Sequence, residues 1–209
     1  MTHRTLGATL VVALVSVGAA TTAAATGRTA SSCGSERWTV RNLFDPTALQ
    51  VDLHAAPADI HYLRSVPRPA RVGPATPRLR PLEFRSFAIK APLLAARRLP
   101  SHDTVAVVGK PPDTMLVVFP DTHLCEDVGL GPHGGDIHSA GDGFNADCGP
   151  SIPSDHWQRL TGDAEIAGVA YFAVRHSSST PGAAPNGLEL HPVMSFWAPG
   201  CRQLNARWP

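Results

Sequence analysis

Five β-rich runs separated by turn signals constrain the fold of this chain more than any other sequence feature. Val, Ile, Phe, Leu and Thr concentrate in these runs, and Gly, Pro, Asp or Ser interrupts the chain between them. The runs cover residues 82–94, 104–108, 114–119, 165–174 and 187–196. Strands at this spacing predict a mainly β domain, built as a small five-stranded antiparallel barrel. Within the first run the apolar alternation changes phase between Phe84 and Phe87, which predicts a bulge or a strong bend.

The N-terminus has the order of residues found in a secretory signal peptide. Arg4 supplies a positive charge, residues 8–20 are apolar or small, and Ala23-Ala24-Ala25 offers a cleavage site. A transmembrane anchor is the rival interpretation, but it needs about 20 strongly apolar residues. We therefore expect a signal peptide over residues 1–25 and a secreted, monomeric protein, extracellular or in the cell envelope, without membrane insertion after cleavage.

The rest of the chain divides by composition. The expected parts are an N-terminal arm with a Pro/Arg-rich connector, the barrel domain and a C-terminal tail, over residues 26–81, 82–201 and 202–209. Short helices are expected over residues 47–51, 58–63 and 154–160. Residues 129–149 are glycine-rich and acidic, with too few large apolar side chains to form a core element, so we expect an exposed excursion there.

Charge is balanced overall but unevenly distributed. The chain has 18 Lys plus Arg and 17 Asp plus Glu, and loss of Arg4 with the signal peptide leaves 17 of each. A neutral protein is a poor general binder of nucleic acid or anionic membranes. Residues 64–98 nevertheless hold nine basic residues and one acid, whereas residues 99–165 hold eleven acids. We favour two charged surfaces that neutralise each other over a basic face for an anionic ligand.

Four cysteines form an even set in a chain predicted to be exported. Disulfides are the usual state in an oxidising compartment, and four cysteines allow three pairings. We favour Cys33–Cys201, which would join the ends of the domain, and Cys125–Cys148, which would close the excursion.

Residues 177–193 contain a loop, a Pro-Asn-Gly turn and a strand with two titratable side chains. In a strand, residues i and i+2 share a face. Leu188 and Leu190 can therefore face the core while Glu189 and His191 face the other side. The pair could serve as an acid–base or metal pair, but a structural role on a solvated face is the reading we favour. Asn186-Gly187 predicts a turn that needs a positive φ.

Two family resemblances follow from these residues. The segment 184–193 resembles the C-terminal APNGxELHPV signature of a family of small exported bacterial proteins of uncharacterised function, and the strand order looks like an OB-type barrel. The resemblance implies a compartment and a fold, but no reaction. The chain departs from that family at Val105, where its members tend to carry a histidine in the second strand; the nearest histidine here is His102.

A weaker resemblance is to staphylococcal-nuclease-like OB barrels. The segments at Asp103-Thr104-Val105 and Pro120-Asp121-Thr122 are similar to that family's DGDT and DTPE segments. In the family, acidic residues there bind calcium and arginines stabilise phosphate charge, which makes Asp103 and Asp121 candidates for catalysis. The chain lacks the glycine before Asp103 and has valines where the strand arginine is expected, so transition-state charge stabilisation would be lost.

No dedicated metal site or cofactor is predicted. His133, His138, Asp142, Asn145 and Asp147 are ligand types close in sequence, but their spacing matches no zinc or calcium loop. Weak, adventitious binding of calcium is the most that the pattern supports.

The sequence favours a non-catalytic binding module that uses one face of an OB-like barrel, and it leaves the ligand open, with an anionic molecule among the options. The expected ligand surface consists of Arg85, Lys90, Tyr171, Glu189 and His191. The alternatives are a divergent calcium-dependent phosphodiesterase, with Asp103, Asp121, Glu189 and His191 as candidates, and a structural envelope protein.

Overall fold

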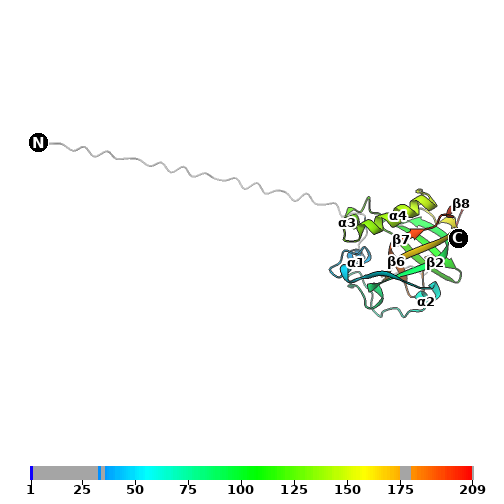
Figure 1. Ribbon diagram of the computed structural model, residues 1–209, viewed down its shortest axis with the longest axis horizontal. Helices are drawn as coiled ribbons and strands as arrows, with labels where there is room; N and C mark the ends of the chain where they lie inside the picture. The colour runs from blue at the N-terminus through cyan, green and yellow to red at the C-terminus, as the bar shows by residue number, and fades with distance from the viewer. Residues whose placement is uncertain (2–32, 34–35, 175–179, 209) are drawn as a thin grey trace. The chain divides into compact units, whose positions relative to one another are not determined.

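The computed structural model describes residues 1, 33, 36–174 and 180–208 (Figure 1). Apart from Met1, the predicted signal peptide lies outside these residues. All helices and strands below belong to the unit Ser31–Pro209. Among the described residues, none of the helices combines the length and the apolar character needed to cross a membrane.

Five strands close into a barrel. They are β2 (Arg85–Arg98), β3 (Thr104–Lys110), β4 (Asp113–Phe119), β6 (Asp163–Phe172) and β7 (Leu188–Trp197). Their neighbours follow the order β2-β3-β4-β7-β6, and β6 pairs again with β2. This is the strand order of an OB-type barrel and confirms the predicted fold class. The barrel is mixed rather than purely antiparallel, because β4 and β7 run parallel.

Three further strands extend the sheet beyond the barrel. They are β1 (Asp52–Pro57), β5 (Gln158–Thr161) and β8 (Arg202–Arg207). β1 lies parallel to β2, whereas β5 connects β2 to β8. The helix expected over residues 154–160 is therefore wrong, because Gln158 and Arg159 pair with the second half of β2. β8 likewise occupies most of the segment expected to be a tail.

β2 changes partners along its length. Its first half pairs with β6, and its second half pairs with β3 and β5, with a register shift between Leu93 and Ala95. The irregularity expected between Phe84 and Phe87 occurs in the pairing of β2 with β1, whose register shifts between Asp52–Arg85 and Ala56–Phe87. The pairing of β2 with β6 is regular from Ser86 onward, and a 3-10 helix, η2 (Leu82–Phe84), precedes the strand. A bend in a long strand lets it take part in two sides of one barrel.

The barrel interior contains one face of each strand. Phe87, Ile89, Leu188 and Leu190 lie in this core, as the alternation predicts. Val193 also lies in the core, although it is four residues from Glu189 and would share the outer face with Glu189 in a regular strand. Register shifts in the β6–β7 pairing around Gly168 change the phase between Leu190 and Val193.

Helices form where an exposed excursion was expected. α3 (Glu126–Gly129) and α4 (Gly134–Cys148) follow β4, and α4 lies beside β7 (Figure 1). Phe144 of α4 packs between Phe119 and Phe196, with ring centroids 4.7 and 5.4 Å away. The small side chains of α4 allow this close packing, and its apolar face is buried despite four glycines in fifteen residues.

The disulfides join Cys33 to Cys125 and Cys148 to Cys201. All four cysteines are bonded as expected, but both favoured pairings are wrong. A helix of fifteen residues is about 22 Å long, so α4 separates Cys148 at its end from Cys125 before α3. Disulfides persist in oxidising surroundings, and the two bonds indicate such an environment.

The arm and the connector are held against the barrel by arginines. Short helical segments occur at α1 (Trp38–Arg41), η1 (Ala48–Gln50) and α2 (Ile60–Ser65), the last two close to the expected positions. Arg37 and Glu83 form a fully buried ion pair at 2.5 Å. Arg78 is bonded to Asp45, and Arg68 donates to the carbonyls of residues 173, 174 and 186. Much of the basic stretch is thus used inside the fold.

The Asp45–Arg78 pair affects titration. Burial of the Asp45 carboxyl opposes its ionisation, but the hydrogen bonds from Arg78 and Thr47 outweigh burial and lower the pKa of Asp45. The carboxylate is therefore charged at neutral pH and anchors the connector to the arm.

Candidate functional site

A cavity of about 550 Å³ lies on the outer face of the barrel. Val105, Leu116 and Val118 supply apolar side chains from β3 and β4, and Tyr171, Glu189 and His191 supply polar ones from β6 and β7. Arg97, near the end of β2, and Leu99, just beyond it, also line the cavity. The remaining large side chains are those of Glu36, Arg41 and Trp157. In OB barrels, oligosaccharides and oligonucleotides bind to the corresponding strands and to the loops beside them.

Glu189 and His191 form a buried hydrogen-bonded pair in this cavity. His191 Nδ1 lies 3.0 Å from Glu189 Oε1, and the two residues are only 2% and 4% exposed. The expected solvated face is therefore absent at these two positions, because the arm and the loop after residue 180 cover the strands. The hydrogen bond to Glu189 orients the imidazole ring.

Tyr171 borders the same pair from β6. It is opposite Glu189 in the β6–β7 register, and its ring centroid is 5.4 Å from that of His191. Burial raises the pKa of the Tyr171 phenol, and the negative charge of Glu189 raises it further. The phenol therefore stays protonated near neutral pH and retains a hydrogen-bond donor.

Asp103 extends the polar cluster at the start of β3. Its Oδ2 accepts a hydrogen bond from Ser101 Oγ at 2.9 Å and lies 3.4 Å from Arg41 Nη2. Burial raises the pKa of Asp103, while the charges of His191 and Arg41 act in the opposite direction. The Asp103 side chain has no exposed surface. Burying a charged carboxylate costs folding free energy unless the group is paired or protonated.

Three atoms of this cluster have no hydrogen-bond partner in the part of the chain that the structure describes. They are Arg41 Nε, Asp103 Oδ1 and His191 Nε2, all buried. An unmade hydrogen bond at a buried group costs about 1–3 kcal/mol. Because most buried polar groups in native proteins are hydrogen-bonded, three unpaired atoms in one cluster call for an explanation, such as a ligand or a bound water.

The five residues expected to share a ligand surface are in different places. Tyr171, Glu189 and His191 line the 550 Å³ cavity, but Lys90 lines another one. The Arg85 guanidinium lies over the ring of Phe87, 5.4 Å from its centroid. The structure therefore brings together only the β6–β7 part of the expected surface.

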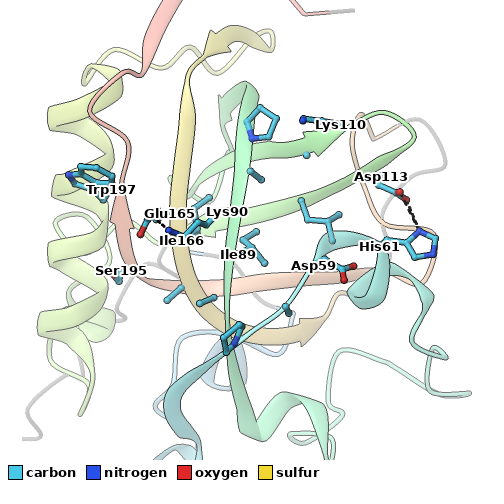
Figure 2. A pocket seen from close by; sticks show the side chains of 18 residues that line it. Asp59, His61, Ile89, Lys90, Lys110, Asp113, Glu165, Ile166, Ser195 and Trp197 are labelled. Atoms are coloured by element: carbon cyan, nitrogen blue, oxygen red, sulfur yellow. Dashed lines mark hydrogen bonds and ion pairs between the residues drawn. The ribbon is translucent and has the colours of Figure 1, made fainter.

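The cavity that Lys90 lines is larger, about 910 Å³, but four of its titratable side chains are paired with one another (Figure 2). Lys90 faces Glu165 at 2.5 Å, and His61 faces Asp113 at 3.3 Å. These four side chains are between 42% and 79% exposed. Solvated pairs of this kind are common on surfaces, so the smaller, more buried cavity is the stronger candidate.

Asp103 and Asp121 do not meet in one cavity. Asp121 lies at the end of β4, where Oδ2 accepts from Arg98 at 3.1 Å and Oδ1 accepts from the backbone N–H groups of His123 and Leu124. It lines a third cavity, of about 230 Å³, and Asp103 is not among the residues around it. Asp121 acts as the turn-capping residue that an Asp at a strand end commonly is.

Two residues of these sites, Arg41 and His123, were not found from the sequence, whereas His138 and Asp142 were recognised as metal-ligand types without a recognised spacing. Arg41 comes from the N-terminal arm, far along the chain from Asp103, and no local pattern marks it. His123, His138 and Asp142 bring their ligand atoms within 4.8 Å of one another. The four-residue spacing of His138 and Asp142 would have indicated this cluster, had the segment been recognised as a helix.

Comparison of the chain with protein-family models, curated proteins and solved structures finds no match.

Proposed function

We propose that the protein is an exported, monomeric binding module that takes a neutral, polyhydroxylated ligand, such as a short oligosaccharide, in the 550 Å³ cavity. The observation that carries this proposal is the buried Glu189–His191 pair in the wall of that cavity. The volume is within the usual range for small-ligand sites, about 300–1,000 Å³.

The charges around the cavity favour a neutral ligand over an anionic one. Arg41 is already paired with Asp103, and Arg97 donates to the carbonyl of Ser154 at 3.0 Å. Glu36 and Glu189 add acidic groups to the same wall. Because acids and bases balance, the cavity offers donors and acceptors for hydroxyl groups without a net positive field.

The cavity also contains an aromatic side chain on which a sugar ring can pack. Trp157 lines the cavity and is held edge-on by Trp208, with ring centroids 6.4 Å apart. A held aromatic ring offers a flat apolar surface at low entropic cost, and the C–H face of a pyranose can pack on it.

The test is titration calorimetry of the mature, oxidised protein against neutral oligosaccharides, anionic oligosaccharides and single-stranded oligonucleotides. Trp157→Ala should weaken binding by about tenfold or more, equal to about 1.4 kcal/mol. Trp197→Ala is the matched control, because Trp197 is 60% exposed and lines the other cavity; its effect should be less than about twofold.

Three results would overturn the proposal. One is failure of every neutral saccharide to bind, and another is an equal effect of the two tryptophan variants. The third is calcium-dependent cleavage of DNA or RNA that Asp121→Asn abolishes, which would favour the phosphodiesterase alternative.

A further inference from the structure

Three metal-ligating side chains meet beside the end of β4, in a cavity separate from the proposed ligand site. His123 lies in the turn after β4, and His138 and Asp142 lie one turn apart on α4. Residues four apart on a helix share a face. The packing of α4 against the barrel brings that face to His123.

The distances fit a small divalent ion. His138 Nε2 lies 3.2 Å from Asp142 Oδ2, and His123 Nε2 lies 3.8 Å from Asp142 Oδ1. Two ligands of a tetrahedral zinc ion, each about 2.1 Å from the metal, are about 3.4 Å apart. The two His–Asp separations lie near this value, and one ligand atom from each of the three residues lies within 4.8 Å of the others, so side-chain rotations can bring all three around one ion.

The surrounding residues hold the ligands in place. Thr122 Oγ1 lies 2.7 Å from His138 Nδ1, which fixes the ring and directs Nε2 toward Asp142. The Asp121 carboxylate caps the turn that carries His123 and is itself bonded to Arg98. Partners of this kind orient metal ligands, and their loss typically costs 10- to 100-fold in affinity.

We propose that His123, His138 and Asp142 form a Zn²⁺ site with three protein ligands. Two imidazoles and one carboxylate suit zinc and other late first-row metals, whereas calcium prefers oxygen ligands alone. The ligands also line the 230 Å³ cavity. Three protein ligands leave a fourth position for water or an exogenous ligand, and bound zinc lowers the pKa of such a water toward about 7.

The exposure of the ligands makes the site accessible. The side chains of His123, His138 and Asp142 are 70%, 43% and 56% exposed. An ion can therefore enter and leave without unfolding of the domain.

The test uses untagged mature protein with its disulfides intact. Zinc affinity is measured by competition with a chromophoric chelator, and Co²⁺ replaces zinc for absorption spectra. We expect one ion per chain, visible bands typical of low-coordinate Co²⁺, and a loss of at least about tenfold in affinity for His138→Ala and for His123→Ala.

The matched control is His54→Ala. His54 also faces an aspartate, with Nδ1 3.2 Å from Asp52 Oδ1, but this pair is on β1 and has no third ligand near it among the described residues. Its removal should leave zinc affinity unchanged. Circular dichroism of each variant checks that the fold is intact.

The proposal fails if zinc does not bind saturably, if His54→Ala weakens binding as much as His138→Ala, or if both ligand variants bind like the wild type. Tighter binding of calcium than of zinc would also overturn it. None of these results depends on saccharide binding, because the two cavities share no lining residue.

Discussion

The buried pair Arg37–Glu83 offers a sharp test of how this fold is held together. The Glu83 carboxylate accepts from Arg37 Nη1 at 2.7 Å and Nη2 at 2.5 Å, and from the backbone N–H groups of Leu79 and Phe172 at 2.6 and 2.9 Å. Both side chains have no exposed surface. Glu83→Gln keeps the size of the side chain but leaves the guanidinium buried without its counter-ion.

The expected loss of unfolding free energy is about 3–5 kcal/mol, the usual cost of removing one partner of a buried pair. This is a large share of the total for a domain of this kind, about 5–15 kcal/mol. The control is Glu165→Gln, because Lys90–Glu165 has the same 2.5 Å separation but side chains that are 78% and 50% exposed. Its expected cost is below about 1 kcal/mol.

Urea denaturation of the oxidised proteins at pH 7, followed by circular dichroism, measures both values. The comparison tests burial together with the hydrogen bonds that burial makes indispensable, since the shortest N–O distance is the same in the two pairs but Glu83 also accepts from two backbone N–H groups. If Glu83→Gln costs no more than Glu165→Gln, the argument that low solvent access makes the Arg37–Glu83 pair essential is wrong.

Two further predictions concern the backbone and pH. Gly187 has a φ of +70°, and a Cβ there would collide with the guanidinium of Arg68. Gly187→Ala should therefore lower the unfolding free energy by about 1–3 kcal/mol, measured by urea denaturation. An unchanged denaturation midpoint would contradict this prediction. For Asp103, burial raises the folded-state pKa above its ordinary value of 3.8. The unfolded chain then ionises first, so wild-type stability should fall relative to Asp103→Asn as pH rises above 3.8 toward the folded-state pKa. Parallel pH profiles from urea melts would contradict this assignment.

Sequence reasoning succeeded where the pattern was local. The apolar alternation at Leu188 and Leu190 places both in the core and directs Glu189 and His191 to the outer face. It failed at α4, where four glycines in fifteen residues concealed a helix whose apolar side chains recur at helical spacing. Because Gly lowers helix propensity by about 1 kcal/mol per residue, only burial of Phe144 and its neighbours against the barrel accounts for the helix.

The same limit explains the cysteine pairing and the sites. The even number of cysteines predicted that all four form disulfides, but the length of α4 determines which cysteines lie close enough to pair. The zinc site depends on the same helix, because residues 138 and 142 share a face only in helical conformation.

The sequence by itself determined the five barrel strands, the faces of Glu189 and His191, and the even set of disulfide-forming cysteines, because strand periodicity and turn chemistry act over a few residues. Tertiary structure alone decided that Arg41 meets Asp103 and that His123 meets α4. These contacts join segments far apart in the chain. They form because the arm and the helix bury their apolar faces against the closed barrel, which brings Arg41 and His138 to their partners.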